Sequence, residues 1–195
     1  MNKLLSIALL SLIINCGNAQ ELKKAHVDFD YLQDLVTQVK PHREKRLIDL
    51  DEFLKRSKQK NTVILDTRSK EMFDKKHVKG AVNINFSDFT QSALDNFFRN
   101  YEGKNTRILI YCNNNFEDRS AADLQDQYFI TKAVQPRSAK ITENNSRTLA
   151  LNIPTYINLF GYGYKNVFEL HELVDVNDPR IEFEGTDSKS KLAVR

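Results

Sequence analysis

The sequence predicts an α/β fold in which a central parallel sheet is flanked by helices on both faces. Two short apolar runs, residues 62–66 (TVILD) and 107–111 (RILIY), lack the alternation of polar and apolar residues that marks a half-exposed strand. Segments with helical spacing of apolar residues alternate with these strand-like runs, as expected of strand–helix–strand units. The length of 195 residues suits one domain with a sizeable core.

The N-terminal part of this fold is expected to begin with an amphipathic helix. Apolar residues recur at helical spacing over residues 20–40, and Pro41 is expected to end that helix. A short strand is expected over residues 47–50. Asp51 is suited to cap the helix that we expect over residues 52–58.

The middle of the chain is expected to continue the same alternation. After the first apolar run, the sequence predicts a helix over residues 69–76, a short strand over 81–85 (AVNIN) and a helix over 94–101. The second apolar run then delivers Cys112 at its C-terminal end. Ligands of parallel sheets bind beyond the carboxyl ends of the strands, so Cys112 lies where a binding site is expected.

Residues 113–146 interrupt this order with asparagines, charges and a proline, although residues 118–128 have some helical character. A connection of this length in a compact domain is either functional or mobile. A helix is expected again over residues 148–160. Pro154 leaves its start open between an N-cap at Asn152 and an earlier, kinked beginning.

The C-terminal part of the chain is expected to hold one more strand, over residues 166–170, directly after a glycine-rich helix stop. The tail from residue 175 onward is charged, and we expect it to be loosely held.

The first nineteen residues have the three parts of a secretory signal peptide. A single lysine precedes an apolar run over residues 4–14, which is too short to span a bilayer comfortably. Gly17 and Ala19 are small residues at the positions that a signal peptidase reads, so cleavage is expected before Gln20. The sequence therefore predicts an exported protein, most simply in a bacterial periplasm, with no integral membrane segment in its mature chain.

The two cysteines have different expected fates. Cys16 is removed with the signal peptide or, alternatively, carries a lipoprotein anchor, against which Asn15 argues because that processing prefers a small residue there. Cys112 is then alone in an oxidising compartment, where cysteines usually pair. Such a thiol is either buried and inert or kept for its reactivity.

Composition excludes some partners. The formal net charge of +3 is too small to argue for a nucleic acid or an anionic membrane surface. Basic clusters over residues 40–46 and 55–60 have acidic neighbours, so we interpret them as solvated helix faces. The sequence gives no indication of oligomeric state.

Three motifs carry a resemblance to a known family. The first is Asp66-Thr67-Arg68, followed by Glu71, Phe73 and the run His77-Val78-Lys79-Gly80-Ala81-Val82-Asn83-Ile84. The second is the apolar strand that ends in Cys112, and the third is the glycine–tyrosine segment over residues 161–167. With these motifs, the chain resembles the rhodanese-like family over most of its mature length.

The resemblance implies a chemistry for Cys112. In this family the cysteine thiolate takes the outer sulfur of a donor such as thiosulfate, becomes a persulfide, and passes the sulfur to a thiol or to cyanide. The resemblance assigns the amides of Asn113 and Asn114 to an anion-binding nest and an arginine at the far end of the loop to the anionic donor. The implied partners are a small sulfur-containing anion or a protein thiol or persulfide, with no cofactor and no metal.

Two arginines compete for that position because the loop is longer than in the family. Arg119 begins a segment (RSAA) that resembles the family motif slightly late, and Arg147 begins a second one (RTLA) that is better spaced from the later glycines. We favour Arg147 as the equivalent of the helix start, with residues 113–146 as an insertion. Glu117 and Asp118 would disfavour a thiolate and repel an anionic donor.

The remaining motif residues are interpreted as architectural. Asp66 is expected to cap turn amides, and Arg68 is expected to pair with Glu71 or with a sheet carbonyl. His77 is expected to be a hydrogen-bonded turn histidine rather than a metal ligand, and Gly80 turns the chain into the next strand.

The chain is therefore divided into a signal peptide (1–19), an N-terminal helical extension (20–46), a rhodanese-like domain (47–174, with the insertion at about 113–146) and a charged tail (175–195). The leading hypothesis is a periplasmic sulfurtransferase or sulfur carrier. The alternatives are a catalytically silent module that binds a protein through its long loop, and a thiol redox sensor.

Overall fold

A computed structural model describes residues 22–120, 133–134, 147–148 and 150–189. Within them, the main sheet has five strands in the order β1-β9-β5-β2-β4, and every pair is parallel. This sheet confirms the predicted α/β class. Its strands are β1 (Leu47–Ile48), β9 (Val167–Leu170), β5 (Arg107–Ile110), β2 (Thr62–Asp66) and β4 (Val82–Asn83).

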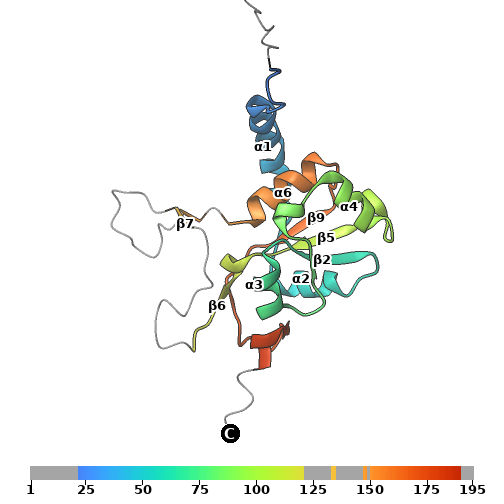
Figure 1. The fold of residues 1–195 in the computed structure, drawn as a ribbon. Coiled ribbons are helices and arrows are strands. Elements are labelled where there is room, and N and C mark those ends of the chain that lie inside the picture. Colours follow the sequence, from blue (N-terminus) through green and yellow to red (C-terminus); the bar gives the residue numbers. More distant parts are fainter. Residues whose placement is uncertain (1–21, 121–132, 135–146, 149, 190–195) are drawn as a thin grey trace, which may run out of the picture.

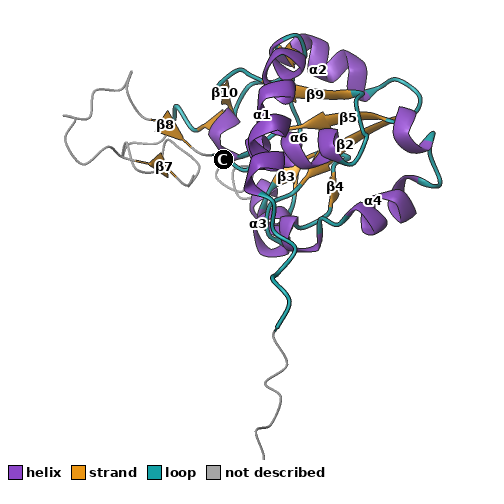
Figure 2. Ribbon diagram, turned by 90° about the horizontal axis from the view of Figure 1, so that it is seen from above, coloured by secondary structure: helices purple, strands orange, loops and turns teal. Residues whose placement is uncertain are grey.

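Helices cover both faces of this sheet (Figure 1). One face packs against α1 (Phe29–Glu44), α4 (Gln91–Phe98) and α6 (Asn152–Gly161), and Figure 2 shows α1 and α6 lying over the same part of the sheet. The other face packs against α2 (Leu50–Ser57), whereas α3 (Lys70–Lys75) lies at the opposite end of the sheet, next to β3 (His77–Val78) (Figure 2).

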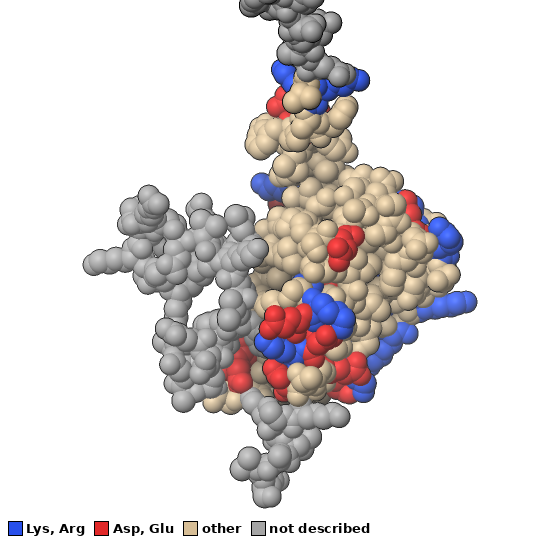
Figure 3. Space-filling view, in the orientation of Figure 1, with Lys and Arg blue, Asp and Glu red and all other residues tan. Residues whose placement is uncertain are grey.

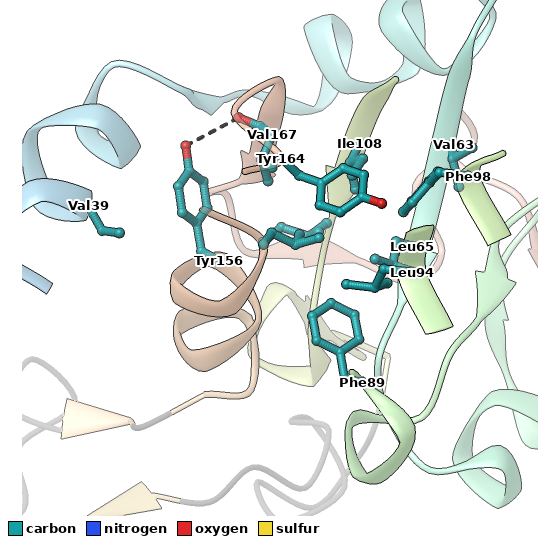
Figure 4. Packing of buried hydrophobic residues seen from close by; sticks show 12 residues of the cluster. Val39, Val63, Leu65, Phe89, Leu94, Phe98, Ile108, Tyr156, Tyr164 and Val167 are labelled. Atoms are coloured by element: carbon teal, nitrogen blue, oxygen red, sulfur yellow. Dashed lines mark hydrogen bonds between the residues drawn. The ribbon is translucent and has the colours of Figure 1, made fainter. Parts of the chain in front are cut away.

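The two predicted apolar runs lie at the centre of the sheet, and each contributes side chains to both cores. In β5, Ile108 and Ile110 point to the α6 side, whereas Leu109 points to the α2 side. Figure 4 shows the core on the α6 side, where aromatic rings from α4 and α6 pack on the strands. Because both faces are buried, these strands need no polar side chains, which explains their lack of alternation.

The helix α1 differs from the prediction at both ends. It begins at Phe29, and Asp28 caps it by accepting a hydrogen bond from the Tyr31 amide. Residues 22–27 are not helical. It continues past Pro41 to Glu44, so the predicted end at Pro41 is wrong. Two long-range contacts, from His42 and Arg43, hold the last turn, and such tertiary contacts offset the backbone hydrogen bond that proline cannot donate.

Two other helix starts also differ from the prediction. Asp49, not Asp51, caps α2, since its Oδ1 accepts from the amide of Glu52 at 2.8 Å. The helix α6 begins at Asn152, so Asn152 is its first residue rather than its cap, and Pro154 falls in the first turn, where a missing amide costs no intrahelical bond. Most of the candidate helix over residues 118–128 lies outside the described residues.

The segment after the last sheet strand is packed against the domain, contrary to the expectation of a loose tail. β10 (Val174–Asp175) pairs with β6 (Phe116–Glu117), and β11 (Phe183–Glu184) pairs with β3 (His77–Val78). Ile181, only 5% exposed, anchors this segment in the core on the α2 side. Ile181 and Phe183, which packs against the same core, therefore hold this segment on the domain despite the charged residues around them.

Short elements complete the described structure. A small antiparallel pair joins β7 (Ala133–Val134) to β8 (Arg147–Thr148). The 3-10 turns are η1 (Phe86–Asp88), η2 (Gly103–Asn105), η3 (Asn113–Asn115) and η5 (Thr186–Lys189). In the part of the chain that the structure describes, no helix has the length and apolar character needed to cross a membrane.

Acidic and basic side chains are mixed over α3 and its surroundings (Figure 3). Lys70 pairs with Asp74 at 2.5 Å and Lys75 pairs with Glu71 at 2.7 Å, each one helical turn apart. Opposite charges at this spacing offset one another, so this face presents both signs together.

Candidate active site around Cys112

Cys112 follows the central strand β5 at the carboxyl edge of the sheet. Its backbone is still extended (φ −144°, ψ 176°), and the turn η3 begins directly after it. The residue is only 6% exposed. Extended geometry alternates side chains, so Cys112 projects to the same face as Ile110, which is the face covered by α6.

The first turn of α6 lies over this end of the sheet. Asn152 donates from Nδ2 to the carboxylate of Glu169 in β9, and the hydroxyl of Thr155 is 2.8 Å from that of Thr67, directly after β2. Since β5 lies between β9 and β2, the start of α6 lies beside Cys112. A helix start carries partial positive charge, which favours a thiolate.

A buried polar network holds the residues on both sides of Cys112. The hydroxyl of Tyr111 donates to Asp66 Oδ2 at 2.6 Å and accepts from the amide of Val78 at 3.1 Å. Arg68 donates from Nε and Nη2 to the Asp66 carboxylate, and from Nη1 to Asn113 Oδ1 at 2.7 Å. The strand end of β2 thus fixes the residue before Cys112 and the residue after it.

The charges in this network explain the direction of two shifts. Burial raises the pKa of Tyr111 well above 10, and the negative charge of Asp66 adds to that effect, so the phenol stays protonated and remains a donor. Burial opposes the charge on Arg68, but the hydrogen bonds and charge of Asp66 outweigh it and raise the pKa of Arg68. The Asp66–Arg68 ion pair therefore stays charged and holds Tyr111 and Asn113 in place.

Asn115 is a site residue that the sequence analysis missed. Its Oδ1 accepts from the amide of Cys112 at 2.9 Å, and its Nδ2 donates to the carbonyls of Leu170 at 2.8 Å and Glu172 at 3.2 Å. It therefore ties Cys112 to the end of β9. The signal in the sequence was the third asparagine after the cysteine, a residue type that bonds to turn backbone.

The predicted anion-binding residues have different environments. Asn113 is buried beside Arg68, whereas Asn114 is half-buried, and its enclosed Oδ1 has no hydrogen-bond partner among the described residues. Arg119 pairs with Glu117, so the acid that was expected to oppose a thiolate has a cationic neighbour.

Arg147 lies in β8, opposite Val134 and five residues before α6, and its side chain lies outside the described structure. The structure therefore has Arg147 in a strand rather than at the helix start. Its role as an anion clamp stays a prediction.

The residues interpreted as architectural have the following contacts. Asp66 Oδ1 accepts from the amide of Arg68 at 2.9 Å, and Arg68 reaches the Lys76 carbonyl rather than Glu71. His77 has its Nδ1 2.6 Å from the carbonyl of Phe73 and stacks on the Phe73 ring. Gly80 has a φ of +77°, a left-handed conformation that glycine tolerates.

Among the side chains that the structure describes, no group of three or more histidines, cysteines or acids could hold a metal ion. The described site is organised around the Cys112 thiol by hydrogen bonds and by the buried Asp66–Arg68 ion pair.

Fold and site together define an α/β domain with a buried cysteine at the end of its central parallel strand. The family model of the rhodanese-like domain matches residues 49–172, well over half of the chain. The chain therefore belongs to the rhodanese-like domain family, as the sequence motifs predicted. No curated protein matches it significantly.

Proposed function

We propose that this protein is a rhodanese-like sulfur carrier or sulfurtransferase that forms a persulfide on Cys112. Family membership supports a sulfurtransferase-type or sulfur-carrier protein. The observation that carries the proposal is the position of Cys112, at the end of the central strand and beside the start of α6. Its two neighbours in the chain, Tyr111 and Asn113, are held by hydrogen bonds to Asp66 and Arg68. The partial positive charge of a helix start favours the thiolate form of a nearby cysteine.

The proposed reaction has two displacement steps without net oxidation of the protein. The Cys112 thiolate attacks the outer sulfur of thiosulfate, a new S–S bond forms, and sulfite leaves with the electron pair of the broken bond. The thiolate of an acceptor then attacks the outer sulfur of the persulfide. That step forms the acceptor persulfide and returns the Cys112 thiolate.

The charges near the loop bear on the choice of donor. Glu117 is 7% exposed and ion-paired with Arg119, which offsets the repulsion expected between this acid and an anionic donor. We therefore include small sulfur-containing anions among the donors, together with protein persulfides. Arg147 and Arg119 are the two proposed anion clamps.

Export is part of the proposal and comes from the N-terminal sequence. A signal peptide over residues 1–19 would place the mature protein, beginning at Gln20, in a bacterial periplasm. Mass analysis of the N-terminal peptide from a periplasmic fraction tests this. An N-terminus at Gln20 is expected, whereas a lipid-modified Cys16 in the membrane fraction would establish the anchored form.

One observation favours a second candidate, a catalytically silent module. The Cys112 amide donates to Asn115 and is therefore not available to an anion, and Cys112 is only 6% exposed, so access to its thiol is limited. The silent module would bind a protein through the segment 113–146. A redox-sensing thiol is the third candidate, and it predicts a sulfenic acid on Cys112 after peroxide treatment.

A turnover assay separates these candidates. Thiocyanate formation from thiosulfate and cyanide is measured for the mature protein, with Cys112→Ser and Tyr162→Phe as the inactive and neutral comparisons. Turnover that disappears only in Cys112→Ser supports the enzyme. Absence of turnover with thiosulfate and with a protein persulfide donor would eliminate it.

A further inference from the structure

Arg43 forms a long-range ion pair that joins the N-terminal extension to the interior of the domain. It lies near the C-terminal end of α1, outside the matched residues 49–172. Its Nε donates to Glu169 Oε2 at 2.5 Å and its Nη2 donates to Glu169 Oε1 at 2.6 Å. Glu169 is only 1% exposed, so this bidentate pair holds a buried carboxylate of β9.

The same carboxylate also holds the start of α6. Glu169 Oε1 accepts from Nδ2 of Asn152, the first residue of that helix, which is itself 3% exposed. One buried group therefore joins α1, β9 and α6. Glu169 is the register partner of Ile110, which is two residues before Cys112 on the same face.

We propose that Arg43 is a positioning residue for Cys112, through Glu169 and the first turn of α6. A buried carboxylate without its cation must recruit water or move. Either response displaces the side-chain amide of Asn152 that is bonded to it, and with it the helix start beside the thiol. The inference rests on the proposed function, in which Cys112 is the reacting group, and it makes α1 part of the support of the site.

A second contact of α1 has a different role. His42 Nδ1 is 2.9 Å from the hydroxyl of Tyr156, which lies in the second turn of α6, and Val39 packs in the adjacent core. These contacts dock the helix but do not reach Glu169. Val39→Ala is therefore a matched control, because it weakens the docking of α1 and leaves the Arg43–Glu169 pair in place.

The test compares Arg43→Gln, Arg43→Lys, the double variant Arg43→Gln/Glu169→Gln and Val39→Ala in the full mature chain. Two readouts are measured under conditions where each variant is folded: hydrogen exchange of a peptide covering Asn152 to Tyr156, and the rate of Cys112 alkylation by iodoacetamide. The rate of persulfide formation with thiosulfate is measured alongside them.

Arg43→Gln is expected to accelerate exchange in the first turn of α6 by about tenfold and to change the alkylation rate severalfold, in line with the loss of one buried interaction. Arg43→Lys, which keeps the charge but not the bidentate geometry, is expected to fall between. The double variant is expected to restore both readouts, since the oxygen of the new glutamine amide can still accept from Asn152 without an unpaired charge. Val39→Ala is expected to leave both unchanged.

Faster exchange confined to α1 in Arg43→Gln, with unchanged alkylation of Cys112, would overturn the inference. So would a double variant that stays as perturbed as the single one. Absence of persulfide in the unaltered protein, with exchange and alkylation still responding to Arg43, would refute the proposed function while the positioning role stands.

Discussion

Replacement of Tyr111 by phenylalanine tests the network that holds Cys112 with the loss of a single oxygen atom. The hydroxyl is buried, donates to the Asp66 carboxylate at 2.6 Å and accepts from the Val78 amide at 3.1 Å. Phenylalanine fills nearly the same volume, so the change leaves packing almost intact and removes only the two hydrogen bonds.

The loss in free energy of unfolding follows from the two hydrogen bonds that the Tyr111 hydroxyl makes. A hydrogen bond to a charged group contributes about 1.5–3 kcal/mol, and a buried amide left unpaired costs about 1–3 kcal/mol. Asp66 keeps its bonds from Arg68, so its carboxylate is not orphaned, whereas the Val78 amide loses its hydroxyl acceptor. We therefore expect Tyr111→Phe to lower the free energy of unfolding by about 3 kcal/mol.

Urea unfolding followed by circular dichroism measures this change, with an unchanged slope as the sign that the folded and unfolded states are comparable. Tyr162→Phe is the control, because the half-buried Tyr162 hydroxyl makes one long bond, 3.4 Å to the Phe89 carbonyl. It should cost less than about 1 kcal/mol. Equal losses in the two variants would refute the assignment of a supporting role to the Tyr111 hydroxyl.

Three further predictions concern other parts of the molecule. Gly185→Ala should detach the C-terminal segment, because its φ is +124° and a Cβ would collide with the Lys75 carbonyl oxygen; limited proteolysis should then cleave that segment, and unchanged resistance would contradict the packing. Asn115→Ala should lower the free energy of unfolding by about 2 kcal/mol and accelerate Cys112 alkylation, and a variant with unaltered alkylation would show that Asn115 does not restrain the thiol. Burial and nearby cations lower the pKa of His42 below 6.5, so its contribution to stability is present above that pH and is lost as the pH falls below it; the decline below pH 6.5 should be shallower in His42→Gln, and equal slopes would exclude His42 as its source.

The sheet could be predicted from the sequence because burial on both faces leaves a local mark. TVILD and RILIY have no polar positions in their interiors, and both became central strands. The end of α1 could not be predicted in this way, since the contacts that carry it past Pro41 come from residues more than a hundred positions away. The packing of residues 175–189 was missed because Ile181 and Phe183 stand singly among charges.

The candidate site was predictable only in part, for the same reason. Cys112 follows a recognisable strand, so its place at the sheet edge follows from sequence order. Asp66 and Arg68 were each assigned to architecture, but their ion pair was not predicted, and the link from Arg68 to Asn113 depends on two strands that are adjacent only in the fold. The triad of Arg43, Glu169 and Asn152 has no local signature at all.

Persulfide formation on Cys112 adds one sulfur atom to the protein, so intact mass detects it directly. The masses of the purified protein and of Cys112→Ser are measured before and after incubation with thiosulfate. We expect a gain of one sulfur atom that is absent from Cys112→Ser and is removed by a thiol. No gain with thiosulfate or another sulfane sulfur donor, together with slow alkylation of Cys112, would contradict it and leave the silent module as the function to pursue.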